Sequence, residues 1–120
     1  MKNEDLKRQL YVQTGCFHGL PQGWVESFLP NLIDDLFEIL GGYAEDWMVL
    51  QAKEKFGELR LYWGWRDRDY SISEQEFLIS LIDKIEAVID EYRLVSRRTC
   101  WKCGNTVKEY DTYCERCKDE

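Results

Sequence analysis

The stretch WMVLQAKEKFGELRLYWGW (residues 47–65) decides the fold, because its side chains follow a period of two on both sides of Gly57. Successive side chains of a strand point to opposite faces, so this pattern predicts two strands joined as a β-hairpin. We expect the turn at residues 54–57, where Gly57 can adopt a positive φ and end a three- to five-residue loop with a bulge. A single hairpin is marginally stable in water, so one face has to pack against helices.

An amphipathic helix is predicted on the N-terminal side of the hairpin, over residues 24–40. Apolar residues recur there at spacings of three and four, which marks one buried helix face: Trp24, Phe28, Leu29, Leu32, Ile33, Leu36, Phe37 and Leu40. Pro30 does not fit a helix interior, because it has no N–H to donate. Either the helix bends at Pro30, or residues 24–29 form a separate turn and Pro30 opens the main helix.

Nearer the N-terminus, residues 3–13 have a helical pattern in which Leu6 and Leu10 are four residues apart. Residues 14–23 contain three Gly and one Pro and are expected to form a loop. Cys16 and His18 in this loop suggest a second metal site or a nucleophile–base pair. Neither two further metal ligands nor an orienting group accompanies them, so a free cysteine and an ordinary loop histidine are the preferred interpretation.

The longest predicted helix follows the hairpin and covers residues 74–96. A charged connection over residues 66–73 leads into it, and Ser73 with Glu76 fits a capping box. Its apolar stripe consists of Phe77, Leu81, Ile82, Ile85, Val88, Ile89, Tyr92 and Val95. The order helix, helix, hairpin, helix predicts an α+β fold with helices packed on a β-hairpin, in a core domain over residues 1–96.

Four cysteines in the stretch CWKCGNTVKEYDTYCERC (residues 100–117) form two Cys-x-x-Cys pairs. Each two-residue gap lets a tight turn point both sulfurs at one ion, and two such pairs make a closed tetrahedral site for one structural zinc. The predicted ligands are Cys100, Cys103, Cys114 and Cys117. Two disulfides or an iron–sulfur or redox centre are the alternatives, but nothing in the chain indicates an oxidising compartment, and a thioredoxin-like pair needs a βαβ context.

This segment resembles the short zinc ribbons at the ends of many bacterial proteins, in which a Cys-x-x-Cys-Gly turn precedes an aromatic residue and a second Cys-x-x-Cys. Gly104 and Tyr113 fill the glycine and aromatic places, and Trp101 stands where those ribbons usually have proline. Residues 97–120 are therefore predicted to form a small C-terminal zinc-ribbon module. Such ribbons contact DNA, RNA or protein, so the resemblance implies a metal and not a partner.

The chain also resembles a family of small phage and prophage proteins without an assigned activity, from about residue 23 to residue 117. Two features carry the likeness: Gly23 with Trp24 at the head of an apolar helix, and KEKFGELRLYW (residues 53–63) followed by a helix and paired cysteines. The chain departs from this pattern at Glu58, where a second glycine is expected, and in its long connection after the hairpin. The resemblance implies a phage-related setting and carries no catalytic residue.

Charge is divided unevenly along the 120 residues. Residues 1–92 hold 9 Lys and Arg against 18 Asp and Glu, whereas residues 93–120 hold 7 against 5. An acidic body favours basic partners and repels phosphate, although such acidity often serves solubility alone. The N-terminal residues 1–13 contain no apolar signal-peptide core, and no segment has the ~18 apolar residues of a membrane helix, so we expect the cytoplasm, that of the host cell if the protein is phage-encoded.

The expected function is macromolecular binding without catalysis, because the sequence contains no phosphate loop, catalytic triad, open metal site or cofactor motif. We expect a phage-type accessory protein whose partner is a host or phage protein. The candidate contact residues are Trp63 and Trp65, which fall on one strand face, together with Arg97, Arg98 and Trp101 around the cysteines. For the two tryptophans, core packing is the competing interpretation.

Nucleic-acid binding by the C-terminal module is the alternative function. Basic residues flank Trp101 and the cysteine pairs there: Arg93, Arg97, Arg98, Lys102, Lys108, Arg116 and Lys118. Four thiolates and one zinc, however, add about −2 and leave the module close to neutral beside an acidic body. An enzyme with an unrecognised site is the third hypothesis.

Overall fold

The structure is a computed structural model that describes residue 17 and residues 19–118. The helix expected over residues 3–13, and with it Cys16 and His18, lies outside these residues. Among the described helices, none combines the length and the apolar content that crossing a bilayer requires.

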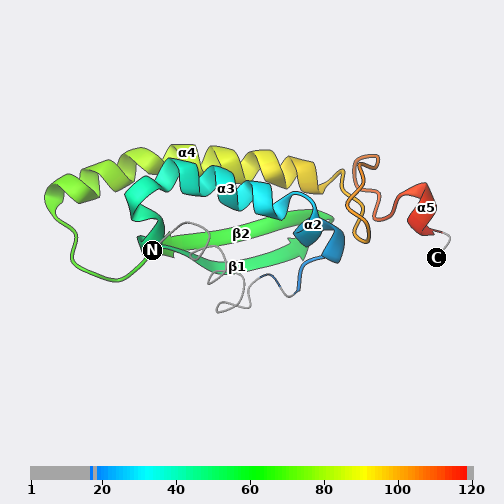
Figure 1. The fold of residues 1–120 in the computed structure, drawn as a ribbon, viewed down its shortest axis with the longest axis horizontal. Coiled ribbons are helices and arrows are strands. Elements are labelled where there is room, and N and C mark those ends of the chain that lie inside the picture. The colour runs from blue at the N-terminus through cyan, green and yellow to red at the C-terminus, as the bar shows by residue number, and fades with distance from the viewer. Residues whose placement is uncertain (1–16, 18, 119–120) are drawn as a thin grey trace.

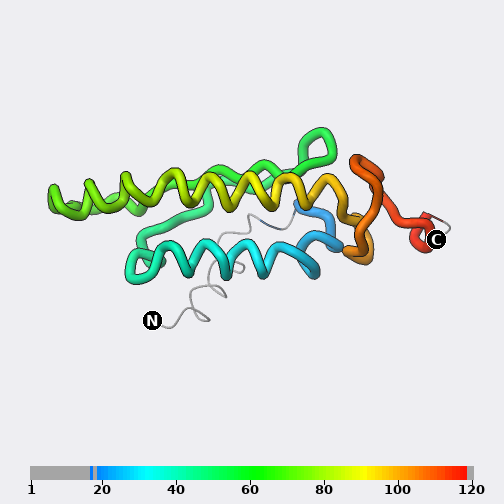
Figure 2. The backbone as a smooth tube through the Cα atoms, turned by 90° about the horizontal axis from the view of Figure 1, so that it is seen from above, coloured from blue at the N-terminus to red at the C-terminus, as the bar shows by residue number. Residues whose placement is uncertain are grey.

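The protein consists of two antiparallel helices on a two-stranded hairpin, with a small cysteine-containing module at one end (Figure 1). In chain order the elements are α2 (Gln22–Glu26), α3 (Leu29–Leu40), the 3-10 helix η1 (Gly41–Asp46), β1 (Trp47–Lys55), β2 (Glu58–Trp65), α4 (Ile72–Ser96) and α5 (Glu115–Lys118). Helix α4 packs against both α3 and β2, and Figure 2 shows it running beside α3. This arrangement confirms the predicted α+β fold class.

Helix α3 supplies much of the buried core. Its inward face contains Leu29, Leu32, Ile33, Leu36, Phe37 and Leu40, all nearly inaccessible to solvent. Pro30 lies in the first turn of α3, where its missing N–H removes no intrahelical hydrogen bond, and α2 is a separate short helix before it. Of the two interpretations of Pro30, the separate turn is therefore confirmed.

The hairpin has the predicted strands but a tighter turn than expected. Residues pair in antiparallel register from Trp47 with Trp65 to Lys55 with Glu58, which leaves a loop of only Phe56 and Gly57. Both loop residues have positive φ, 56° and 84°, as two-residue hairpin turns of type I′ require. The expected longer loop is wrong, and the irregularity of the ladder lies instead in the middle of β1, between residues 49 and 51.

The capping box of α4 forms two residues earlier than predicted. The Ser71 hydroxyl accepts from the backbone N–H of Glu74 (3.1 Å), and the Glu74 carboxylate accepts from the N–H of Ser71 (3.0 Å). The predicted pair of Ser73 and Glu76 is wrong, although it fits the same pattern. Further contacts favour the earlier pair, because the Glu74 carboxylate also accepts from Arg68 (3.2 Å) and from the Tyr43 hydroxyl (3.3 Å).

The buried face of α4 is rotated slightly from the predicted stripe. Leu78, Leu81, Ile85 and Ile89 are buried, whereas Phe77 and Val95, which the periodicity placed inside, are exposed. Helix α4 faces α3 on one side and β2 on the other, so its contact surface is wider than one stripe. Near its C-terminal end, the Ser96 hydroxyl accepts from the N–H of Leu59 (2.8 Å) and so covers the edge of β2.

Candidate metal centre

Four cysteine thiols converge in the module that follows α4. The Sγ atoms of Cys100, Cys103, Cys114 and Cys117 all lie within 4.8 Å of one another, and those of Cys103 and Cys114 are 3.6 Å apart. A tetrahedral ion with metal–sulfur bonds of about 2.3 Å needs sulfur atoms about 3.8 Å apart. The four residues that the spacing predicted are thus brought together in a group that could hold one metal ion.

Backbone hydrogen bonds form the two turns that present the thiols. In the first turn the N–H of Gly104 donates to the carbonyl of Cys100 (3.0 Å), and Gly104 has a φ of +82°. The second turn is the start of α5, where the N–H groups of Cys117 and Lys118 donate to the carbonyl of Cys114 (both 3.0 Å). Each pair of cysteines therefore has a fixed backbone behind it, as a preorganised metal site requires.

The electrostatics of the four thiols favour a cation among them. Burial opposes ionisation of Cys100, but backbone hydrogen bonds from residues 102, 103 and 114 outweigh it and lower the pKa of this thiol to about 6. Burial and the neighbouring thiols raise the pKa of Cys117 to about 12. Thiolates this close repel one another, so a bound cation is what allows all four to ionise together.

The disulfide alternative is not realised in the structure, since all four cysteines are free. The sulfur atoms of Cys103 and Cys114 are 3.6 Å apart, far more than the ~2.05 Å of a disulfide bond. Within each pair one cysteine is less accessible to solvent than the other: Cys100 and Cys117 are buried, Cys114 is half-buried and Cys103 is exposed. The site therefore has a solvent-facing side at Cys103.

Helix α2 sits directly against the first cysteine turn through Gly23. The N–H of Gly23 donates to the carbonyl of Trp101 (2.6 Å), and a Cβ at Gly23 would lie 2.1 Å from the carbonyl oxygen of Cys100. The approach is reciprocal, because a Cβ at Gly104 would lie 2.8 Å from the carbonyl oxygen of Gly23. Only glycine permits backbones to come this close.

Two tryptophans extend the contact between α2 and the module. Trp24 is fully buried and meets Trp101 edge to face, with ring centroids 5.9 Å apart. Its indole N–H donates to the carbonyl of Thr99 (3.4 Å), the residue before the first ligand. Trp101, predicted as a partner contact, is half-buried against the core in the structure. The domain boundary predicted at residue 96 is therefore crossed by close packing, and the independence of the two parts stays a prediction.

Glu58 makes a second connection between body and module. This carboxylate is almost completely buried and binds three guanidinium groups, those of Arg60 (2.7 Å), Arg93 (3.2 Å) and Arg97 (2.6 Å). Burial alone would raise its pKa, but the hydrogen bond from Arg97 and the charges of the three arginines lower the pKa below its ordinary value. Glycine at position 58 would leave these arginines without a shared partner.

Tyr110 joins the same cluster from the module. Its N–H donates to the carbonyl of Arg97 (2.7 Å), and its ring lies 5.3 Å from the Arg97 guanidinium carbon. The ring also packs over the hairpin turn, because a Cβ at Gly57 would lie 3.2 Å from it. The hairpin turn, the end of α4 and the module thus meet at one point.

The other four candidate contact residues differ in their exposure to solvent and in the residues that they contact. Trp63 and Trp65 lie on one strand face as predicted, with centroids 5.2 Å apart, and pack half-buried against the core. Arg97 is held by Glu58 and by Glu109 (3.3 Å). Arg98 is 64% exposed, with Glu109 3.9 Å away. A role of these residues in partner binding remains a prediction.

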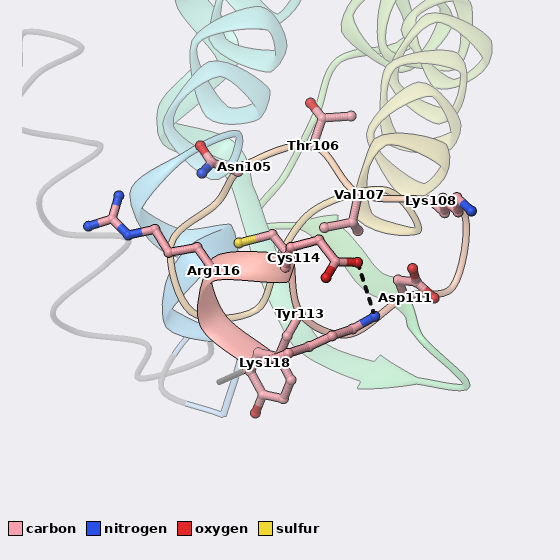
Figure 3. Close-up of a pocket in the computed structure, with 10 residues that line it drawn as sticks. Asn105, Thr106, Val107, Lys108, Asp111, Tyr113, Cys114, Arg116 and Lys118 are labelled. Carbon is pink, nitrogen blue, oxygen red and sulfur yellow. Dashed lines mark ion pairs between the residues drawn. The ribbon is translucent and has the colours of Figure 1, made fainter. Parts of the chain in front are cut away.

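A hollow of about 490 Å³ opens beside the second cysteine pair (Figure 3). Its lining mixes charges of both signs: Lys108, Arg116 and Lys118 with Asp111 and Glu115, around Tyr113 and Cys114. Lys118 and Glu115, three residues apart on α5, form an ion pair at its edge (4.0 Å, dashed in Figure 3). This balance of charge selects neither anions nor cations.

Sequence analysis missed Glu58 and the role of Gly23 as connections between body and module. The module residues that Gly23 meets lie 77 to 81 positions away, and Arg93 and Arg97 lie 35 and 39 positions from Glu58, so no local pattern encodes these contacts. The one signal in the sequence was Gly23 directly before Trp24. In the structure Gly23 permits the close approach of the backbones, and Trp24 fills the space beside Trp101.

Comparison with protein-family models, with curated proteins and with solved structures gave no match. The fold and the site define the class: a small α+β protein in which four cysteines form a candidate metal site beside a helix-covered hairpin.

Proposed function

We propose that the protein is a non-enzymatic, phage-type accessory protein that carries one structural zinc and binds a protein of its host or of the phage, in the host cytoplasm. The proposal has two parts, a metal and a partner, which different observations support.

Zinc is supported by the ligand chemistry and the spacing. Four thiolates form a soft donor set, which suits zinc, copper(I) or iron–sulfur clusters. All four sulfur atoms lie within 4.8 Å of one another, which matches a single ion, whereas a cluster of several atoms holds its cysteines further apart. With four protein ligands a tetrahedral ion keeps no open position, so we assign the zinc a structural role.

Protein binding is supported by one observation above all, the apolar surface on the outer face of the hairpin. Met48, Leu50 and Tyr62 are 38%, 59% and 48% exposed on the side turned away from the helices. Clustered exposed apolar side chains on a small protein mark contact sites for other macromolecules. The nucleic-acid alternative is weakened because Arg93 and Arg97, two of its basic residues, are paired with Glu58.

An affinity capture experiment tests the proposed partner class. Tagged full-length protein is used to capture binding partners from bacterial lysate, with and without nuclease, and the bound proteins are identified by mass spectrometry. We expect one or a few proteins that resist nuclease and bind in stoichiometric amounts. A nuclease-sensitive set would favour nucleic-acid binding, and the absence of any saturable capture would contradict the proposed function.

A further inference from the structure

The outer face of the hairpin forms one continuous surface, which we define by Met48, Leu50, Lys53, Arg60 and Tyr62. Leu50 lies over Gly64 of the neighbouring strand, with its Cδ1 3.4 Å from the position a Cβ there would take. The Lys53 ammonium lies 5.8 Å from the Tyr62 ring. These contacts show that the side chains of both strands share this face.

The irregularity in β1 makes this surface more prominent. The ladder shifts between Val49 and Gln51, so Leu50 is the extra residue of a bulge. Bulges redirect side chains, and here Val49 stays buried while Leu50 is 59% exposed. The exposure of Leu50 at the apolar end of the outer face thus follows from the bulge in β1.

Charge on the outer face is opposite to that of the whole chain. Lys53, Lys55 and Arg60 lie along it, whereas the protein has a net charge of −7. Glu58, the carboxylate at the start of β2, is already bound by three arginines. The ammonium groups of the two lysines lie near aromatic rings, that of Lys53 near Tyr62 and that of Lys55 near Phe56 (5.6 Å). Within the described part of the chain neither lysine forms an ion pair with a carboxylate, so both can receive an external one.

We infer that the outer face binds an acidic segment of the partner protein. Apolar side chains of that segment cover Leu50 and Tyr62, and its carboxylates pair with Lys53 and Lys55 towards the turn. This inference rests on the proposed function and adds to it the surface and the chemical class of the partner. Nucleic acid fits less well, because Tyr62 is the one ring of the defined surface that could stack on a base, whereas Met48 and Leu50 offer none, and because the acidic body repels a long polyanion.

Site-specific photo-crosslinking tests the surface. The full-length protein carries p-benzoylphenylalanine in place of Leu50 or, as a matched control, in place of Ile79, an aliphatic residue of α4 that is 66% exposed. After irradiation in bacterial cells, crosslinked peptides are mapped by mass spectrometry. We expect position 50 to crosslink a protein segment in which Asp and Glu outnumber Lys and Arg, and position 79 to crosslink it at least tenfold less.

Charge reversal tests the chemistry of the same surface. Lys53→Glu with Lys55→Glu is expected to lower the crosslinking yield at position 50 about tenfold, the effect of unfavourable charge at an interface, whereas Lys84→Glu on α4 leaves it unchanged. Circular dichroism confirms that both variants fold.

The outcomes separate this inference from the proposed function. Crosslinks to a protein from position 79 and not from position 50 would overturn the surface and leave protein binding intact. A crosslinked segment without excess acidity, or a yield that survives the double reversal, would overturn the acidic partner. Crosslinks to RNA or DNA, or none from either position, would contradict the inference together with the proposed function.

Discussion

Gly23 is the residue at which the body of the protein and the cysteine module come closest. Its backbone donates to Trp101, and its missing Cβ leaves room for the carbonyl of Cys100. Glu58 acts at the same scale from the opposite side, by holding the arginines of α4 against the hairpin. Both residues contact segments that are distant in the sequence, so the neighbouring residues do not indicate their roles.

Replacing Gly23 with alanine is expected to lower the free energy of unfolding by about 1–3 kcal/mol, because the new Cβ would meet backbone atoms that cannot move aside cheaply. Gly42→Ala is the matched control: no atom lies within 4 Å of its Cβ position, so we expect no loss. Urea unfolding of both variants measures the difference. Equal stability of the two would contradict the close approach.

Glu58→Gln is expected to destabilise the protein by about 1–3 kcal/mol at pH 7, the range for a hydrogen bond to a charged group. The folded-state pKa of Glu58 lies below its ordinary 4.5, so the ionised carboxylate stabilises the fold above that pH, and this stabilisation is lost as pH falls through the folded-state pKa. The gap between wild type and variant should therefore narrow below pH 4.5. Unfolding curves across pH test this, with Glu76→Gln on the exposed face of α4 as control.

At the scale of elements, the period-two stretch and the apolar stripes predicted the hairpin, α3 and α4, because these patterns follow from which faces are buried. The exact residues at which these elements begin and end were harder to predict. Residues 71–76 contain two overlapping capping boxes, and the contacts of Glu74 with Arg68 and Tyr43 favour the earlier one. The cysteine spacing predicted the candidate site, since its four ligands depend on two short turns. The contacts of Gly23 and Glu58 depend on distant segments and were not predictable.

The hairpin turn gives an element-scale prediction, because Phe56 occupies a conformation that suits other residues better. Phe56 has a φ of 56°, and its side chain is 79% exposed. Asparagine adopts positive φ more readily, so Phe56→Asn is expected to raise the free energy of unfolding by about 0.5–1 kcal/mol. Gly57→Ala should lower it by about 1 kcal/mol or more, through positive φ and contact with Tyr110. Thermal unfolding of both variants measures this. A destabilised Phe56→Asn would show that the ring matters more than the backbone.

At the scale of the whole molecule, the module and the body are in contact through α2. Removing the metal with a chelator should expose the amide of Gly23, which donates to Trp101 next to the first ligand, to hydrogen exchange. The amide of Ile85 in the middle of α4 is expected to stay protected, since it is buried against α3 and the hairpin. Unchanged protection at Gly23 after metal removal would mean that the contact between α2 and the module does not depend on the metal.

The central claim is that the four cysteines hold one zinc ion on which the module depends. Native mass spectrometry of the full chain, purified without added metal, tests it most directly. We predict one zinc per chain in the wild type, and a reduced zinc-bound fraction in Cys103→Ser, which lacks one of the four thiolates. A metal-free wild type whose Gly23 amide is still protected, or a chain carrying iron, would contradict the claim.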